Sequence, residues 1–416
     1  MGSYKIGQKS VKAGKIDVVS TNPMLDIDSE LIERKGAGHP DSICDELSSL
    51  ISQKYSAYTT EHCDGMVLHH QIDKLMMIGG KTEVAFGKGK FVEPIIIVLS
   101  GRISRSFLGK KLPVEDLIED VLRSYFAAKF PMIEFDDTVK IIDLLTSYAG
   151  PGTLKESKGS IANMFSPVEK TSVRGYEDVV ANDTSFCVAY EPLSPLESTV
   201  IKLERHLTSD KKRKENKWLG TDIKVMAYRE GINVDITACI PQIAAYVPDY
   251  EAYKKNLDMI TSEMHVFCEN ELPDYKVNIS TNTKDKYETQ NFYLTVSGAS
   301  LSGDIGVVGR GNRTNGLITS RKPMSMEGTN GKNPRYYAGF IYAVCTKKIA
   351  KRIYDETGFS NIVEIVSQNG GMLLKPWHTR ITTEADANTV KQIVEEELLK
   401  IPEITDEFIA GNLVNH

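Results

Sequence analysis

Residues 33–45 read Glu-Arg-Lys-Gly-Ala-Gly-His-Pro-Asp-Ser-Ile-Cys-Asp, and this stretch joins a glycine-rich turn to the start of a helix. Two glycines allow a tight turn, and Asp41 or Ser42 is expected to cap the helix that follows. The amides of a helix N-terminus favour anions, so His39 and Asp41 are candidates to meet a phosphate and its Mg²⁺. Taken alone, the stretch is also consistent with an ordinary capped helix beside a surface histidine.

Segments with helical and with strand character alternate on both sides of this stretch. Apolar residues recur at three- and four-residue spacing in six predicted helices, at residues 41–60, 114–129, 193–208, 249–271, 337–356 and 385–400. β-Branched and aromatic residues mark seven predicted strands, at 65–71, 91–100, 185–190, 232–240, 275–279, 292–297 and 362–367. Because some strands follow one another without a helix between them, the order predicts an α+β fold rather than a doubly wound parallel sheet.

The whole chain has the composition of an ordinary globular protein. It has 416 residues, of which 41% are hydrophobic and 25% charged, with 50 Lys and Arg against 56 Asp and Glu. The resulting net charge of −6 disfavours a general nucleic-acid or anionic-membrane binder. No glycine/serine or proline linker divides the chain cleanly, so we expect a flexible extension at residues 1–15 and one intertwined unit at 16–416.

The cysteines and the apolar runs indicate in which cellular compartment the protein lies. Six cysteines are scattered without a C-x-x-C pair, which is typical of a reduced intracellular protein. The longest apolar run, residues 94–99, is far shorter than the roughly 20 residues that cross a bilayer. No apolar signal segment follows the N-terminal lysines. These features predict a cytoplasmic location.

Two further acidic elements are candidate site residues. Asp183 opens a predicted strand, where loops that face a ligand commonly lie. Asp222 and Lys224 alternate with apolar residues, which predicts that both side chains lie on one face of a strand. Each element also has a simpler interpretation, a turn aspartate for Asp183 and a solvent-facing ion pair for Asp222 and Lys224.

The long segment from Ser302 to Pro334 carries the strongest functional signal. It holds seven glycines in 33 residues, and loops of this length in compact domains are usually functional or disordered. Its five cations suit a polyphosphate, because arginine and lysine both bind phosphate oxygens; they are Arg310, Arg313, Arg321, Lys322 and Lys332. The Walker A and Rossmann glycine patterns are both missing from the chain. By contrast, the basic run at residues 211–217 is expected to be a solvated loop.

In this order the motifs resemble the S-adenosylmethionine synthetases of the archaeal type. The family pattern G-x-G-H-P-D-S-I-C-D stands at residues 36–45, N-D-T-S-F at 182–186 and D-I-K-V-M at 222–226. It continues with D-x-G-x-V-G-R-G-N-R at 304–313, N-G-L-I-T at 315–319, and R-x-P-M-S-M-E with G-K-N-P at 321–334. The likeness extends from about residue 16 to the C-terminus, and this collinear set of motifs is far more specific than any one of them.

The resemblance implies three similar α+β lobes around a pseudo-threefold axis. It also implies a homodimer whose flat sheets pack face to face, with active sites shared across the interface. The implied reaction joins ATP and L-methionine into S-adenosylmethionine and then cleaves the released tripolyphosphate to phosphate and diphosphate. Mg²⁺ is the implied cofactor, and K⁺ commonly assists.

The resemblance also implies a role for each motif residue. His39, Lys224, Arg310 and Lys332 would be catalytic, with His39 donating to the oxygen next to C5′ of ATP and the three cations binding the triphosphate. Asp41 would hold Mg²⁺. ATP or methionine would contact seven further positions, namely Asp73, Gly150, Gly152, Asp183, Asp222, Asp304 and Arg313.

Three segments depart from the family pattern. The family usually has H-H-N-T-D-Q where residues 69–74 bring Gln71 and Ile72, and G-Q-G-S-M-D where residues 150–155 bring Pro151 and Lys155. After G-K-N-P it usually has a histidine and then a lysine, and this chain has Tyr337 and Phe340. These last changes remove potential cations near the phosphates, unless Arg335 replaces them.

The departures leave three explanations open. They are lineage drift with compensation, a changed preference for acceptor or nucleobase, and a weakly catalytic, regulatory or scaffold homologue. Adenosyl transfer to another thioether and plain hydrolysis of ATP are the enzymatic alternatives. A nucleic-acid binder is disfavoured further, because the basic residues lie in a glycine loop without an array of stacking aromatics.

Overall fold

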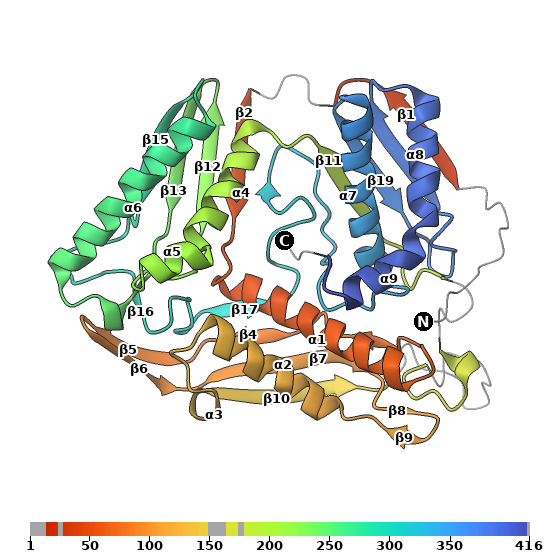
Figure 1. Ribbon diagram of the computed structural model, residues 1–416, viewed down its shortest axis with the longest axis horizontal. Helices are drawn as coiled ribbons and strands as arrows, with labels where there is room; N and C mark the ends of the chain where they lie inside the picture. The colour runs from red at the N-terminus through yellow and green to blue at the C-terminus, as the bar shows by residue number, and fades with distance from the viewer. Residues whose placement is uncertain (1–13, 24–27, 149–163, 174–178, 414–416) are drawn as a thin grey trace.

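Three mixed β-sheets, each covered by helices, make up the computed structural model, which describes residues 14–23, 28–148, 164–173 and 179–413 (Figure 1). This arrangement confirms the predicted α+β class. Within the described residues, no helix is long and apolar enough to cross a membrane.

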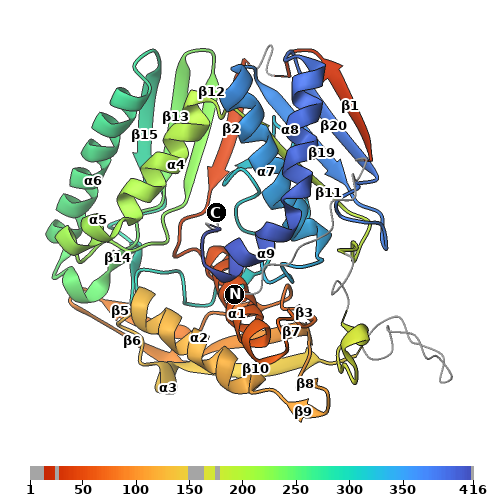
Figure 2. The ribbon, with the colours of Figure 1, turned by 45° about the vertical axis from the view of Figure 1, so that its right-hand side comes forward.

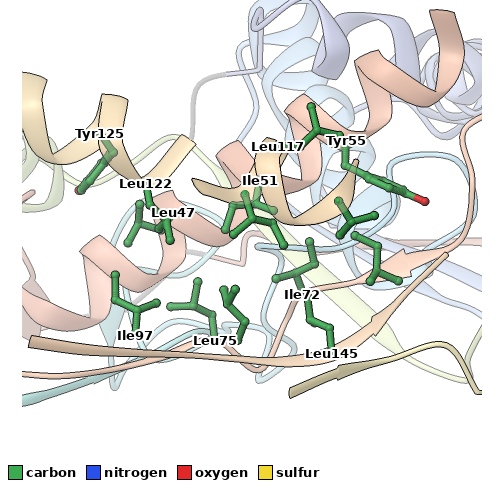
Figure 3. Close-up of a cluster of buried hydrophobic side chains, with 14 of the residues drawn as sticks. Leu47, Ile51, Tyr55, Ile72, Leu75, Ile97, Leu117, Leu122, Tyr125 and Leu145 are labelled. Atoms are coloured by element: carbon green, nitrogen blue, oxygen red, sulfur yellow. The ribbon is translucent and has the colours of Figure 1, made fainter. Parts of the chain in front are cut away.

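Sheet one carries the residues of the predicted site motifs at both of its ends. Its strands run in the order β10 (Val139–Thr146), β7 (Ile95–Ile103), β4 (Met76–Ile78), β17 (Ile305–Val307), and β3 (His70–Gln71) also pairs with β7. Helices α1 (Pro40–His62) and α2 (Val114–Lys129) pack on one face of this sheet (Figure 1). The apolar side chains between them form one continuous core, part of which is drawn in Figure 3; it includes Leu47, Ile51, Tyr55, Ile97, Leu117 and Leu122.

Sheets two and three have cores of their own. Sheet two has the order β15 (Lys276–Thr281), β13 (Asn233–Ala238), β12 (Val225–Glu230), β2 (Ser29–Arg34), β18 (Ile318–Thr319), with helices α4 (Pro195–Thr208) and α6 (Tyr250–Glu271). Sheet three has the order β1 (Lys15–Ser20), β20 (His378–Thr383), β19 (Asn361–Val366), β11 (Phe186–Glu191). Helices α7 (Ala338–Thr357), α8 (Ala387–Leu399) and α9 (Ile401–Ile409) belong to sheet three (Figure 2).

Short elements complete the described chain. They are the hairpins β5 (Lys81–Ala85) with β6 (Lys88–Glu93) and β8 (Ser106–Phe107) with β9 (Lys110–Lys111), the parallel pair β14 (Gln242–Ile243) with β16 (Leu294–Thr295), and the helices α3 (Phe135–Thr138) and α5 (Asp210–Glu215). Segments far apart in the sequence pair repeatedly, since β18 joins β2 and β1 joins β20.

The face of sheet one that is turned away from α1 is apolar and exposed. Alternation along β7 points Ile97 into the core and its neighbours Ile96 and Val98 outward. The same outward row includes Ile305, which is 51% exposed, and Ile142, which is 41% exposed. Exposed apolar faces of this kind occur at protein–protein, membrane and ligand interaction sites.

The six predicted helices are all confirmed, with ends that differ by a few residues. The predicted strands at 65–71 and 292–297 are shorter in the structure, where only two residues of each pair with a neighbour. The prediction of a solvated loop at 211–217 was wrong, because Ser209 caps the short helix α5 and the ammonium of Lys212 forms a buried ion pair with Glu263.

Candidate active site

The N-terminus of α1 presents His39 in a defined orientation. His39 is the N-cap, and its Nδ1 accepts a hydrogen bond from the Asp41 amide at 3.1 Å. The expected cap by Asp41 or Ser42 was therefore wrong, because Pro40 fits the first helical position and moves the cap back to His39. Since Nδ1 is an acceptor, the neutral ring carries its proton on Nε2. Burial and, to a smaller extent, the charge of Lys35 lower the pKa of His39, which favours this neutral form.

Two glycines bring the first motif against the third. A side chain at Gly38 would lie 2.4 Å from Thr221 Oγ1, and one at Gly36 would lie 2.5 Å from the Ile223 carbonyl oxygen. The Gly38 amide donates to the Thr221 carbonyl at 2.9 Å. The close approach of the two backbones is what brings Lys224 into the neighbourhood of His39.

Four of the predicted site residues gather in this first group, which comprises His39, Asp41, Lys224 and Asp304. The charges of Asp41 and Asp304 raise the pKa of His39, and that of Lys224 lowers it, although burial dominates. Asp41 Oδ2 lies 2.9 Å from the Lys35 ammonium, and Asp41 Oδ1 accepts from the Val307 amide at 2.9 Å. The ammonium of Lys224 lies 3.4 Å from Glu33 and is partly exposed.

Asp222 lies deeper than the prediction placed it. Both Asp222 and Lys224 precede β12, so the predicted shared strand face was wrong. Asp222 Oδ2 accepts from the Tyr293 hydroxyl at 2.7 Å, and the Asp222 side chain is buried. Burial raises the pKa of Asp222 to about 7. Such a carboxyl can take either a proton or a ligand donor at neutral pH.

The guanidinium groups of Arg310 and Arg313 differ in their hydrogen-bond partners. Within the described residues, no hydrogen bond or ion pair engages the exposed Arg310 guanidinium. The Arg313 guanidinium instead donates to the Gly309 carbonyl, and its Nε is buried without a partner. Arg310 is therefore free to bind an anion, while Arg313 stabilises the loop that carries it.

A second group surrounds Lys332, whose side chain is only 3% exposed. Its ammonium pairs with Glu327 and lies 4.4 Å from the centre of the Tyr337 ring. Burial lowers the pKa of Lys332 to about 8, and the charges of Asp73 and Asp183 oppose this shift. Asp73 also contacts the Lys74 ammonium at 2.8 Å.

The two groups lie apart in one chain. Asp41 begins α1, and Ser52, eleven residues later, donates to the Lys332 carbonyl, so they are separated by about 16 Å along the helix. Sheet one leads to a similar value. At one end of β7, Arg102 pairs with Gln71, which in turn bridges to Lys332. Toward the other end, Ile96 pairs with Ile78, and Ile78 pairs with β17, which follows Asp304. Arg102 and Ile96 are about 20 Å apart along β7.

The residues that depart from the family pattern pack against neighbouring side chains in the structure. Phe340 is buried, and its ring packs edge-on against Phe408 of α9 with centroids 5.0 Å apart. Tyr337 lies under the Lys332 ammonium, and Ile72 is fully buried in the core of sheet one. The aromatic replacements are therefore matched by packing. Gly150, Pro151, Gly152 and Lys155 lie outside the described residues.

The metal-binding capacity of the first group is limited to few ligands. Across the described ranges, no cluster of three acidic, histidine or cysteine side chains could hold a metal ion. Asp41 offers one carboxylate in the first turn of α1, next to Asp304. This donor set fits Mg²⁺ that takes its other ligands from phosphate oxygens and water.

Sequence reasoning missed three residues that build the site. Lys35 pairs with Asp41, Asp45 accepts the amides of Gly309 and Gly311, and Tyr293 donates to Asp222. Burial raises the pKa of Asp45 to about 6. Lys35 and Asp45 lie inside the opening stretch, so their presence in the motif was the available signal.

Comparison with known proteins gives a consistent result. The family model of S-adenosylmethionine synthetase (AdoMet synthetase) matches residues 13–412. Among curated relatives, an S-adenosylmethionine synthase of Natronomonas pharaonis is 34% identical over 410 residues, covering 96% of this chain and 98% of the relative. That of Pyrobaculum aerophilum is 35% identical over 417 residues, covering 97% and 99%.

A solved structure supports the fold. The structure described as an unusual S-adenosylmethionine synthetase from Campylobacter jejuni matches with a TM-score of 0.55 at 14% sequence identity. The match covers 92% of this chain and 89% of that one. At this identity the likeness concerns the fold alone.

Proposed function

The chain belongs to the S-adenosylmethionine synthetase family, and on that basis we propose that the two groups of residues are the two halves of its active site. Its activity is that of an S-adenosylmethionine synthase, which converts ATP and L-methionine to S-adenosylmethionine. The observation that carries the assignment to this site is the first group itself, where a neutral histidine, two carboxylates and the partly exposed Lys224 ammonium meet near a helix N-terminus.

The chemistry requires little proton transfer in its first step. The methionine sulfur attacks C5′ of ATP, a carbon–sulfur bond forms, and the bond from C5′ to the triphosphate oxygen breaks. A thioether is neutral and becomes a sulfonium without losing a proton, so no general base is needed. What must be stabilised is the negative charge that grows on the leaving triphosphate.

We assign to His39 the donation of a hydrogen bond to the oxygen that leaves C5′. Its Nδ1 is occupied by the Asp41 amide, which leaves the Nε2 proton for the substrate. Lys224 and Arg310 bind the phosphates, and the exposure of both side chains supports this role. The same cations then hold the tripolyphosphate while water cleaves it to phosphate and diphosphate.

The family is generally metal-dependent, and we assign Mg²⁺ to Asp41 and to the phosphate oxygens. Mg²⁺ would neutralise phosphate charge during the displacement. K⁺ is proposed as a second cation, without an assigned residue. Asp222 and Asp304 orient adenosine or the methionine ammonium. A cytoplasmic location is also proposed, and the six cysteines without a disulfide support it.

Lys332, Asp73 and Asp183 complete the site from a second copy of the chain. Ser52, whose hydroxyl donates to the Lys332 carbonyl, lies about 16 Å from Asp41 along α1, and this spacing supports a homodimer with shared sites. The exposed apolar face of sheet one supports the same conclusion, since such a face can pack against the same face of a symmetry mate. We also propose that the three sheet-and-helix units are related by a pseudo-threefold axis, as their separate cores suggest.

The test is product analysis. Purified protein is incubated with ATP, Mg²⁺, K⁺ and methionine, and the products are identified by mass spectrometry beside separate phosphate and diphosphate assays. We expect S-adenosylmethionine together with both phosphate products. Phosphates without a sulfonium, or a sulfonium of another mass, would contradict the assignment of methionine as the acceptor.

A further inference from the structure

Side chains of two other segments hold the backbone on both sides of Arg310. The Gly309 amide donates to Asp45 Oδ1 at 2.7 Å, and the Gly311 amide donates to Asp45 Oδ2 at 3.1 Å. One carboxylate therefore binds the peptides on both sides of Arg310. The Arg310 carbonyl in turn accepts from the Lys35 ammonium at 2.7 Å.

The neighbouring residue is fixed as well. Asn312 Nδ2 donates to the Lys35 carbonyl at 2.9 Å, and the Lys35 amide donates to Asn312 Oδ1 at 3.0 Å. Lys35 and Asp45 thus hold four consecutive residues, 309–312, of a glycine-rich loop. The Arg310 side chain alone extends from this segment without a partner among the described residues.

The contact between Asp45 and the loop leaves no spare room. Asp45 is buried in the second turn of α1, and a side chain at Gly311 would lie 2.1 Å from Asp45 Oδ2. Asn330 also donates to the Asp45 carboxylate. Both Asp45 oxygens therefore accept hydrogen bonds from the segment that carries Arg310.

We propose that Asp45 is a positioning residue that presents the Arg310 guanidinium to the triphosphate. Through the two amides, the rigid helix α1 defines the place of a side chain that lies about 265 residues later in the chain. A charge held in place before the substrate arrives needs no reorganisation when the negative charge develops. The inference rests on the proposed function, since it takes Arg310 to bind the triphosphate.

The consequence can be measured as binding of Mg²⁺–tripolyphosphate by calorimetry. Asp45→Asn keeps the volume of the side chain but turns an amide nitrogen toward one loop N–H. We expect the affinity for Mg²⁺–tripolyphosphate to fall about tenfold, as expected for a weakened charge-assisted contact. The KM for methionine should change less than twofold. Glu46→Gln is the matched control on the next position of α1, since Glu46 pairs with Lys129 and not with the loop.

A double-mutant cycle distinguishes positioning from general damage. If Asp45 acts through Arg310, Asp45→Asn causes no further loss of tripolyphosphate affinity in an Arg310→Ala protein. In a Lys224→Ala protein the tenfold loss persists. An equal loss of tripolyphosphate affinity in the wild-type, Arg310→Ala and Lys224→Ala proteins would overturn the proposal. Should Asp45→Asn fail to fold, Gly311→Ala disturbs the same contact from the loop and replaces it in the cycle.

The outcome also separates this inference from the proposed function. If the wild-type protein makes S-adenosylmethionine but the affinity losses of Asp45→Asn and Arg310→Ala are additive, only the role of Asp45 is refuted. Wild-type protein that neither makes S-adenosylmethionine nor binds Mg²⁺–tripolyphosphate would refute the proposed function.

Discussion

Burial changes the acid–base behaviour of Lys332, a cation that we propose binds phosphate. Its pKa is lowered to about 8 because the side chain is buried, even though Asp73 and Asp183 favour the charged form. The ammonium is therefore charged below pH 8 and loses its proton above that value. A bound phosphate would favour the charged form, so binding and protonation are linked.

This linkage predicts a pH dependence of binding. The affinity of the wild-type protein for Mg²⁺–tripolyphosphate should fall about tenfold between pH 7 and pH 9, because most of the Lys332 ammonium is deprotonated at pH 9. Lys332→Arg keeps its charge throughout this range and should lose much less affinity. Calorimetry at several pH values compares the two proteins, and equal slopes for both would contradict the role of Lys332.

For single residues, the sequence predicted the members of the site where the residue type suits only a few chemical roles. The motifs predicted that His39, Asp41, Lys224 and Asp304 belong together, and the structure brings them together. The roles of Lys35 and Asp45 could not be predicted, because each depends on backbone groups near residue 310 that only the folded chain supplies.

Helix α7 explains two departures from the family pattern as packing. It begins with Tyr337 as its N-cap, and Phe340 lies in its first turn against Phe408 of α9. An aromatic pair in a buried site stabilises the fold, whereas a lysine at the same place would need a partner for its charge. The aromatic residues therefore fit the position of α7 beside α9.

Phe340→Ala should lower the free energy of unfolding by about 3–5 kcal/mol, since it leaves a cavity next to Phe408. The KM for ATP should change less than twofold, because the ring faces the core of sheet three. Chemical unfolding followed by circular dichroism measures the first quantity. Phe359→Ala, at a residue that is 44% exposed, is the control and should cost less than about 1 kcal/mol. A large rise in KM without loss of stability would show that Phe340 serves the site instead.

The predictability of the elements follows from their length. Long helices such as α1 and α6 repeat their apolar spacing over several turns, and the sequence predicted all six of this kind. Strands β4, β17 and β18 have two or three residues and exist only through pairing with distant partners. No local pattern marks such strands, so they could not be predicted from the sequence.

For the whole molecule, the separation of the two groups is the central feature. Within one chain, Asp41 lies in the first turn of α1, and Ser52, whose hydroxyl donates to the Lys332 carbonyl, lies about 16 Å further along the same helix. The sequence predicted the members of both groups. It did not predict the distance between the two groups, because that distance depends on how sheet one and α1 extend between them. We therefore propose that each active site takes residues from two chains.

Mixed dimers test this requirement most directly. Two tags allow purification of a heterodimer in which one chain carries Asp41→Ala and the other carries Lys332→Ala, each of which should be inactive as a homodimer. If the halves come from different chains, one of the two sites is intact, and about half of the wild-type S-adenosylmethionine production should return. The matched heterodimer of Asp41→Ala with Lys224→Ala should stay inactive, because both changes affect the same half. Activity at background level in the first heterodimer would contradict a site shared between two chains.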